Sequence, residues 1–258
     1  LYGINRLGDS ESVLKVDEKS LTEAYFEMLS TAYISLCVSG GDLNTEKIEK
    51  MFFDYFPKVE RSTAKLDTLF VESAEDVTYI KETENIKQGK LVMGFRLGME
   101  NARDGYAARR VMTDLFGGSP HSKLFSVVRE KMSLCYYCSA RMYMRKGIML
   151  VQSGIESQNE EKAREGIMAQ LEALKNGEFS QEELEASQKA LGDAFKGVSD
   201  SPEALDAWLM TQSASGEYKY LEEYIEDFKA GTAEDVINAA KAVTLDTVFM
   251  LSGEEGAE

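Results

Sequence analysis

Few side chains in this chain could support metal or nucleophilic chemistry. The 258 residues include a single histidine, His121. Catalytic zinc sites commonly use two or three histidine ligands, and serine or cysteine nucleophiles depend on a histidine with a well-placed partner. The composition therefore argues against a zinc hydrolase made from this chain alone. His121 follows Ser119-Pro120 at a predicted helix start, and we expect it to cap that helix or lie on the surface.

Three cysteines supply the remaining soft side chains: Cys37, Cys135 and Cys138. Cys135 and Cys138 have the C-x-x-C spacing of redox and metal sites, but no second pair completes four ligands. The pair lies within a predicted strand, so we expect buried or half-buried thiols without a functional role. An odd number of cysteines in a chain of this size fits a reducing compartment better than a disulfide framework, which favours a cytoplasmic location.

The charge of the chain narrows the classes of partner. Asp and Glu number 45 against 29 Lys and Arg, which gives a formal net charge of -16. Such a surface repels nucleic-acid phosphates and anionic membranes. No apolar stretch approaches the length of a transmembrane helix. We therefore predict neither a nucleic-acid partner nor a membrane partner.

The elements that must position these side chains follow from hydrophobic periodicity and from Gly and Pro. We expect helices at 17–30, 44–55, 104–115, 120–129, 160–175, 180–196, 201–214, 218–229 and 232–242, and strands at 32–40, 76–84, 89–97, 134–144, 147–155 and 247–251. Strands dominate early and helices late. This order predicts an α+β fold with an antiparallel or mixed sheet and helices on one face. No G-x-G-x-x-G follows a strand, which argues against a Rossmann fold.

One ordered stretch resembles a known family. Residues 115–125 read LFGGSPHSKLF, and residues 129–136 read REKMSLCY. They are similar to the pattern L-G-G-G-x-x-S-x-L-F-x-x-x-R-E-K-x-G-L-x-Y of peptidase family M16, which includes pitrilysin, insulinase and mitochondrial processing peptidase. Ser119 replaces the third Gly of that pattern, and Ser133 replaces the last. The S-x-x-E capping box that begins at Ser180 fits the same family.

The resemblance implies how the chain is divided. Subunits of this family contain two homologous α+β half-units, and the zinc motif H-x-x-E-H lies near the start of the first; no such motif occurs here. The implied domains are 1–72, the C-terminal portion of a first half-unit, and 73–258, a complete second half-unit that binds no zinc. The second half-unit would have a mostly antiparallel sheet with helices packed on one face. Segment 1–72 has too few elements to bury a core alone.

The resemblance also implies a role for two residues seven positions apart, Arg129 and Tyr136. In family peptidases the matching Arg and Tyr contact the substrate backbone and help to stabilise the tetrahedral intermediate. A guanidinium is a permanent donor to carbonyls, and a phenol can donate to a developing oxyanion. The alternatives are a solvated helix end for Arg129 and an ordinary strand aromatic for Tyr136. Because strand neighbours alternate, we expect only one of Tyr136 and Tyr137 to face the cleft.

Two functions follow as expectations. The first is a non-catalytic M16-type peptidase subunit or fragment that supplies Arg129 and Tyr136 to a zinc-bearing homologue, in a heterodimer, or to a missing N-terminal half. Zinc is then expected only in that partner or missing region, and the chain alone is inactive. The net charge of -16 favours basic, unfolded peptides as substrates. The alternative is a scaffold or peptide-binding module that has lost proteolysis, and self-association is also open.

Overall fold

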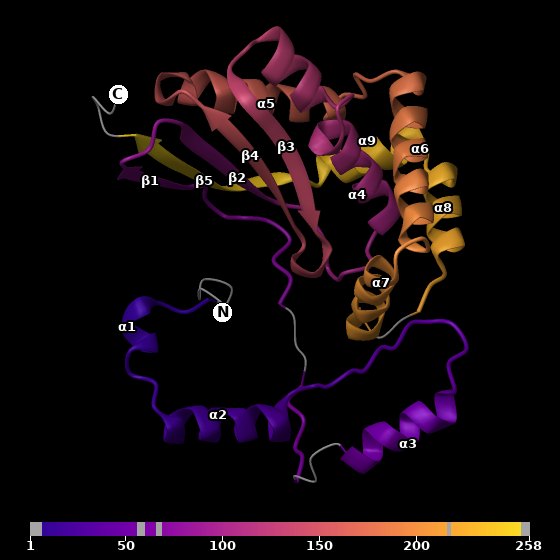
Figure 1. The fold of residues 1–258 in the computed structure, drawn as a ribbon. Helices are drawn as coiled ribbons and strands as arrows, with labels where there is room; N and C mark the ends of the chain where they lie inside the picture. The colour runs from indigo at the N-terminus through magenta and orange to yellow at the C-terminus, as the bar shows by residue number, and fades with distance from the viewer. Residues whose placement is uncertain (1–6, 56–59, 66–68, 216–217, 254–258) are drawn as a thin grey trace. The chain divides into compact units, whose positions relative to one another are not determined.

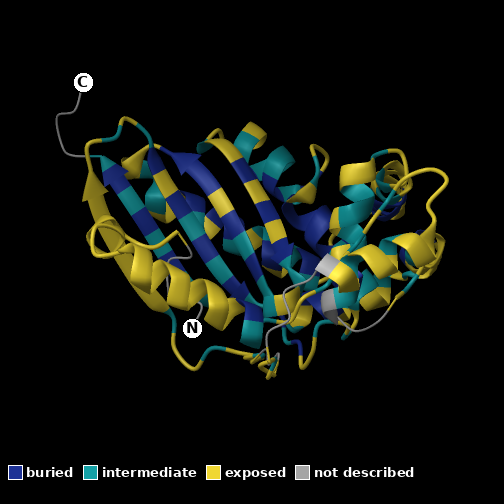
Figure 2. Cartoon of the chain, turned by 60° about the horizontal axis from the view of Figure 1, so that its bottom comes forward, coloured by how far each residue is buried: buried dark blue, intermediate teal, exposed yellow. Residues whose placement is uncertain are grey.

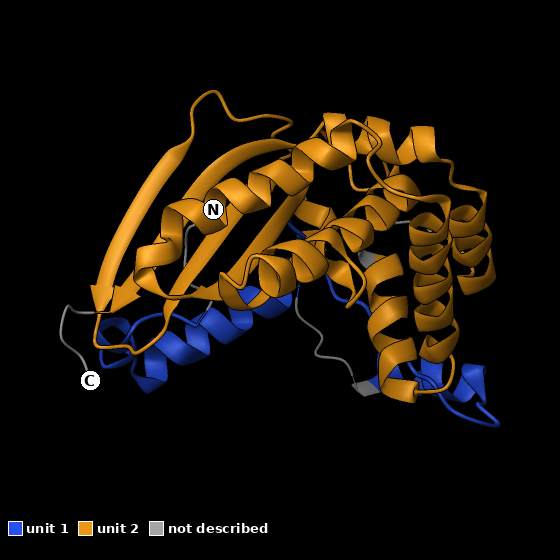
Figure 3. Cartoon of the chain, turned by 90° about the horizontal axis from the view of Figure 1, so that it is seen from above, with its two compact units in different colours: residues 1–67 blue, residues 68–258 orange. Residues whose placement is uncertain are grey.

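The computed structural model describes residues 7–55, 60–65, 69–215 and 218–253. The chain divides into two compact units, residues 1–67 and residues 68–258 (Figures 1 and 3). The family resemblance implies a boundary at 72/73. Each unit is described by itself below.

The first unit consists of helices and extended segments. Its helices are α1 (Ser10–Val13), α2 (Glu18–Thr31) and α3 (Thr45–Tyr55). The carboxylate of Asp17 accepts the Ser20 backbone N–H at 2.7 Å and so begins α2 with a capping box. In the described part of this unit, Leu29 is the one buried apolar side chain.

The predicted strand at 32–40 is wrong. Residues 33–40 carry no helix or strand hydrogen bonding in the structure. The alternating pattern of these residues is real, but a strand also needs a neighbouring strand to bond with. The described part of residues 1–67 contains no strand that could serve. Just before this segment, the Arg61 guanidinium donates to the carbonyls of Leu29 and Ala32 at the end of α2.

The second unit contains a five-stranded sheet. The strands are β1 (Thr78–Glu84), β2 (Gly89–Arg96), β3 (Cys135–Tyr143), β4 (Ile148–Ile155) and β5 (Thr244–Gly253), in the order β1-β5-β2-β4-β3. Every pairing is antiparallel except β1 with β5, which is parallel. The predicted hairpin between β3 and β4 is confirmed, with Gly147 at φ 61° closing its turn. A left-handed φ of this kind favours glycine.

Strand periodicity explains which face of the sheet is covered. Along β2, the side chains of Leu91, Met93 and Phe95 are buried, whereas the intervening positions are half-buried or exposed. The alternation of dark and light positions along the strands is visible in Figure 2. Strand β1 at the edge is exposed along its whole length. A sheet with one apolar face requires a layer of helices on that face.

Helices of the same unit pack on the sheet and on one another. They are α4 (Tyr106–Thr113), α5 (Glu160–Lys175), α6 (Gln181–Val198), α7 (Pro202–Ser215), α8 (Leu221–Ala230) and α9 (Ala233–Lys241), with the π-helical turns η1 (Asp114–Gly118) and η2 (Leu124–Lys131) and the 3-10 turns η3 (Met144–Lys146) and η4 (Ser157–Asn159). Elements η1, η2 and α4 contact β3, whereas α7 packs on α6, and α8 packs on α6 and α4. Helix α5 buries Ala163, Ile167 and Leu171, which are spaced four residues apart. The predicted α+β class, with helices packed on the sheet, is confirmed (Figure 1).

The helices that carry the motif residues 115–125 do not begin and end where the sequence predicts. The helix predicted to end at 115 continues as η1 to Gly118, and the next helix begins at Leu124, not at Pro120. Between them, the Ser122 N–H donates to the Ser119 carbonyl at 3.1 Å. Gly117 packs against β3 so closely that an added Cβ would lie 2.7 Å from the Ala140 nitrogen. Gly117 therefore allows a close approach to the sheet, whereas a Cβ on Gly118 would meet the Asp114 side chain at 2.9 Å.

One buried arginine joins the end of β2 to the start of α4. The guanidinium of Arg109 donates to the carbonyls of Leu97, Gly98 and Asp104 at 3.0, 2.9 and 2.6 Å. Charged donors on buried carbonyls make strong hydrogen bonds because water does not compete. Arg109 thus fixes the loop that leads into the motif helix. Separately, none of the described helices combines the length and apolar character needed to cross a bilayer.

Candidate functional site

The candidate site is built where η2 runs into β3, and a β-bulge shapes it. In the pairing of β3 with β4, Cys135 lies opposite Ile155, Tyr137 opposite Gly154 and Cys138 opposite Ser153. Tyr136 is thus an extra residue in the ladder. A bulge inserts one residue, breaks the alternation of faces and redirects side chains. The bulge could not be predicted from the sequence, because four consecutive strand-forming residues look like a regular strand.

The structure brings Arg129 and Tyr136 together. The Arg129 Nε donates to the Tyr136 backbone carbonyl at 3.1 Å, and its guanidinium carbon lies 4.4 Å from the centre of the Phe125 ring. Arg129 and Tyr136 both line one pocket of about 340 Å³ (the full lining is Gly117, Gly118, Ser119, Phe125, Arg129, Tyr136, Tyr137, Cys138 and Ser139). The contact with the Phe125 ring and the hydrogen bond to Tyr136 hold the Arg129 guanidinium beside the start of β3.

The two tyrosines at the bulge, Tyr136 and Tyr137, have different surroundings. Both residues contribute atoms to the pocket, and their exposed fractions are 63% and 38%. The Tyr137 ring packs over Gly154 of β4, where an added Cβ would lie 2.5 Å from Tyr137 Cε1. The polar side chains that we assign to the pocket are therefore the Tyr136 phenol and the Arg129 guanidinium. These groups can donate hydrogen bonds to carbonyl oxygens, and a phenol can stabilise an oxygen that gains negative charge.

Two thiols lie beneath the bulge. Cys138 is buried, Cys135 is half-buried, and Ser153 between them donates its hydroxyl to the Tyr137 carbonyl at 3.0 Å. A hydrogen bond from the Cys138 thiol, with help from Ser153 and the charge of Arg129, lowers the pKa of Cys135 to about 7. The same contact with Cys135, together with burial, raises the pKa of Cys138. The expected burial of both thiols is confirmed.

His121 lies on the surface of the second unit. It is exposed and sits in the turn before η2, so the predicted surface position is confirmed. No group of three or more His, Cys, Asp and Glu side chains among the described residues is arranged to hold a metal ion. The donor sets in the described part of the chain therefore do not fit a catalytic zinc ion, which needs three protein ligands.

Ser133 and Ser119, the two serines that replace motif glycines, have different backbone conformations. Ser133 has φ 51°, in the left-handed region, whereas Ser119 has φ -131° and is extended. A side chain in the left-handed region costs about 1–2 kcal/mol, and glycine in an ordinary conformation costs roughly 0.5–1 kcal/mol of backbone entropy. The backbone conformation therefore explains why the family pattern has glycine at position 133, but it does not explain the pattern's glycine at position 119.

We predict that Ser133→Gly stabilises the fold by about 0.5–1 kcal/mol, because relief of strain outweighs the added chain entropy. The exposed bond from the Ser133 hydroxyl to the Glu130 carbonyl is lost in this variant. Ser133→Ala loses the same bond but keeps the strain, so it should destabilise, and Ser119→Gly should also destabilise. Urea unfolding of the three variants measures the differences. A Ser133→Gly variant less stable than the parent would contradict the strain argument.

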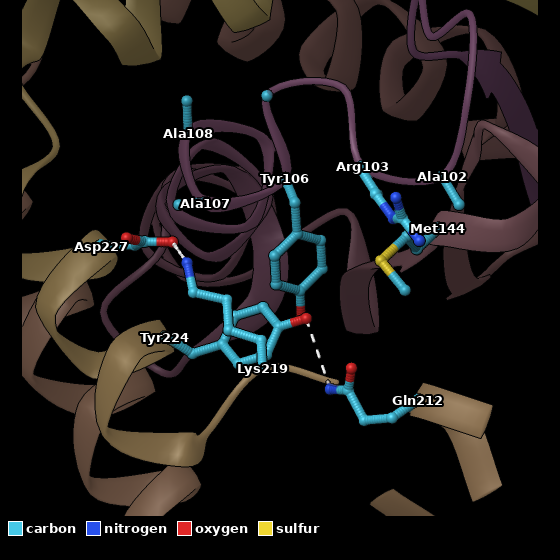
Figure 4. A pocket seen from close by; sticks show the side chains of 11 residues that line it. Ala102, Arg103, Tyr106, Ala107, Ala108, Met144, Gln212, Lys219, Tyr224 and Asp227 are labelled. Atoms are coloured by element: carbon cyan, nitrogen blue, oxygen red, sulfur yellow. Dashed lines mark hydrogen bonds and ion pairs between the residues drawn. The ribbon is translucent and has the colours of Figure 1, made fainter. Parts of the chain in front are cut away.

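A second pocket lies elsewhere in the same unit, between the start of α4, the β3–β4 turn and α8 (Figure 4). Its volume is about 350 Å³, and it shares no lining residue with the first. The rings of Tyr106 and Tyr224 meet edge to face with centres 5.4 Å apart, and Lys219 forms an ion pair with Asp227. Burial raises the pKa of Tyr106. Sequence analysis did not identify this pocket, because its lining comes from segments as far apart in the chain as Ala102 and Asp227.

Comparisons with known proteins agree on one family. The model of the peptidase M16 inactive domain matches residues 15–191. The probable inactive metalloprotease YmfF of Bacillus subtilis is 31% identical over 99% of this chain, and the uncharacterized zinc protease YmxG of the same organism is 25% identical over 97%. The chain spans only 60% and 61% of the lengths of these two proteins.

Solved structures show the same fold. A conserved protein from Enterococcus faecalis V583 superposes with a TM-score of 0.88 at 27% identity, over 97% of this chain and 59% of that one. A peptidase M16 inactive domain from Pseudomonas fluorescens gives a TM-score of 0.73 at 20% identity, over 96% of this chain and 60% of that one. At the lower identity the likeness concerns the fold alone.

Proposed function

Because this chain belongs to the peptidase M16 family and matches its inactive domain, we propose that it is a non-catalytic part of a zinc-dependent peptidase. In this proposal the chain supplies Arg129 and Tyr136 to peptide cleavage that takes place at a zinc ion held elsewhere. That ion would belong to a zinc-bearing M16 homologue or to another region of the same protein. The observation that carries the proposal is that Arg129 and Tyr136 line one pocket and are joined by a hydrogen bond.

The roles follow from the chemistry of the two side chains. A guanidinium has five N–H donors, and the bond to the Tyr136 carbonyl uses one of them. Arg129 would hold a carbonyl of the substrate backbone. The Tyr136 hydroxyl, on a largely exposed side chain, would donate to the carbonyl oxygen that gains charge during cleavage. The pocket therefore binds and orients a peptide and stabilises charge, while this chain supplies no nucleophile.

The domain assignment extends the same proposal. Residues 1–72 would be the end of a first half-unit and residues 73–258 the whole of a second. With a net charge of -16, the assembly would prefer basic, unfolded peptides through steering that weakens with salt. The odd number of cysteines favours the cytoplasm as the compartment.

The test combines metal analysis with reconstitution. The 258-residue chain alone should bind no stoichiometric zinc and cleave no peptide, because one exposed histidine cannot form the site. Addition of a zinc-bearing homologue should give an assembly that cleaves a basic fluorogenic peptide faster than the homologue alone. One tightly held zinc per chain, with chelator-sensitive activity of the chain alone, would contradict the proposal. A stable assembly with no gain in cleavage would favour the scaffold alternative.

A further inference from the structure

We propose that Cys135 and Cys138 form an oxidisable dithiol that a hydroperoxide converts into a disulfide beneath the Tyr136 bulge. This modification site is independent of the proposed peptidase role, since it rests on the register of β3 and β4 and on the surroundings of the two thiols. It also departs from the expectation that the two cysteines have no functional role.

The bulge brings the two cysteines to neighbouring positions on one face of β3. Cys135 and Cys138 are three residues apart in sequence, but their partners on β4, Ile155 and Ser153, are only two residues apart. Two residues of a strand span about 6.6 Å. Disulfides join Cα atoms that lie roughly 4.4–6.8 Å apart, with Cβ atoms about 3.5–4.5 Å apart. In a regular strand the three-residue step would be about 10 Å and the side chains would point to opposite faces. Because Tyr136 is the extra residue, the two thiols face the same side of the sheet at the upper end of this Cα range, and bond formation draws their Cβ atoms together.

The surroundings of the two thiols indicate which one reacts first with the hydroperoxide. Cys135 is half-buried, so a small hydroperoxide can reach it, whereas Cys138 is 4% exposed. The pKa of Cys135 is lowered to about 7 by the hydrogen bond from Cys138, by Ser153 and by the charge of Arg129. A substantial fraction of Cys135 is therefore thiolate at neutral pH, and the thiolate is the reactive form. Cys135 is the attacking sulfur, and Cys138 is the resolving one.

The reaction balances with a hydroperoxide as the oxidant. The Cys135 thiolate attacks the hydroxyl oxygen of the hydroperoxide, a sulfur–oxygen bond forms, the oxygen–oxygen bond breaks, and an alkoxide (or hydroxide from hydrogen peroxide) leaves. The product at Cys135 is a neutral sulfenic acid. The Cys138 sulfur then bonds to the Cys135 sulfur, the sulfur–oxygen bond breaks, and the departing hydroxide takes the thiol proton as water. The two sulfurs are oxidised, and the peroxide is reduced.

The first step also prepares the second. The pKa of Cys138 is raised first by its hydrogen bond to Cys135, then by burial and by the negative charge of Cys135. Conversion of Cys135 to a neutral sulfenic acid removes that charge and weakens the hydrogen bond. The pKa of Cys138 therefore falls once Cys135 is oxidised. The resulting disulfide would lock the bulge that carries Tyr136 and the carbonyl bound by Arg129.

The sequence permits a direct assay. Trypsin cuts after Lys131 and Arg141, so one peptide, 132–141, carries both cysteines. After hydrogen peroxide treatment of the folded chain, this peptide should be lighter by two hydrogens. Chymotrypsin, which cuts after Tyr136 and Tyr137, should leave the two halves joined until a dithiol reductant is added. Cys37 should remain largely unmodified at the same dose.

Variants and a denatured control make the assay decisive. Cys138→Ser should accumulate a sulfenic acid at Cys135 that dimedone traps, Cys135→Ser should leave Cys138 reduced, and Cys37→Ser should behave like the parent. The bridge should form at least 10-fold faster in the folded chain than in urea. A bridge that forms equally fast in urea would overturn the proposal. Irreversible oxidation of Cys135 without a bridge, or equal reactivity of all three thiols, would also overturn it. These results come from the parent chain, so they do not depend on whether the variants fold.

Discussion

Tyr136→Phe and Arg129→Ala are each expected to lower the turnover of the zinc-containing assembly by about 100-fold or more. Loss of a single donor to a developing oxyanion typically costs on the order of 100- to 1,000-fold. Tyr136→Phe removes one hydroxyl from a side chain that is mostly exposed, so the fold should be unaffected. The measurement is kcat and KM on a basic fluorogenic peptide after size-exclusion chromatography has shown normal assembly.

The two variants should differ in how the loss of activity is divided between kcat and KM. The Tyr136 hydroxyl would act on charge that exists only in the transition state, so its removal should lower kcat with little change in KM. Arg129 would bind the substrate backbone and also holds the Tyr136 carbonyl at 3.1 Å. Arg129→Ala should therefore raise KM as well as lower kcat.

Matched controls come from β3. Tyr137→Phe removes the phenol of the residue next to Tyr136, and Arg141→Ala removes an exposed arginine that lies over the Tyr143 ring. We expect less than a 3-fold change in turnover from either control. If Tyr136→Phe and Arg129→Ala assemble normally and retain full activity, the pocket has no part in cleavage and the scaffold alternative stands. If the controls lose as much activity as the two test variants, the effect is one of packing around the pocket.

Helices in the second half of the chain could be predicted from sequence because their signals are local. The box at Ser180 and Glu183 forms as expected, with the Glu183 N–H donating to the Ser180 hydroxyl at 3.2 Å and the Ser180 N–H donating to the Glu183 carboxylate at 2.7 Å. The apolar period of α5 likewise determines its buried face. Such signals depend on residues three or four positions apart, so no knowledge of the rest of the fold is needed.

The features that sequence analysis missed depend on distant partners. The parallel pairing of β1 with β5 joins residues about 170 positions apart, such as Thr78 and Thr247. The failed strand at 32–40 had the right pattern but no partner. The bulge at Tyr136 exists only in relation to the register of β4. In each case the hydrogen-bonding partner decides the structure, and that partner is not encoded locally.

For the candidate site, the residues could be anticipated but their geometry could not. The resemblance named Arg129 and Tyr136, and the structure adds their hydrogen bond and the shared pocket. Ser133 was the one local hint of an unusual backbone, since it occupies a glycine position of the pattern and has φ 51°. A residue with left-handed backbone angles just before a strand marks a sharp change in the direction of the chain.

Residues 68–258 are expected to fold without residues 1–67, whereas residues 1–67 are expected not to fold alone. The second unit has a continuous core that includes Phe95, Phe116 and Phe228, all of them buried. In the first unit the helix α2 leaves apolar side chains such as Leu21 and Tyr25 exposed, at 62% and 52%. Burial of apolar area is the main source of folding free energy. The isolated first segment should therefore lack a cooperative thermal transition and should self-associate.

Limited proteolysis of the whole chain and calorimetry of the two pieces test this expectation. Early cuts should fall between residues 56 and 72, and should leave a resistant fragment that retains the sheet. The 68–258 piece should show one cooperative transition within about 5 °C of the main transition of the whole chain, because its core is retained. Digestion of the sheet before residues 56–72 are cut would show that the boundary is misplaced. A 68–258 piece that is unfolded on its own would show that residues 1–67 are needed to complete its core.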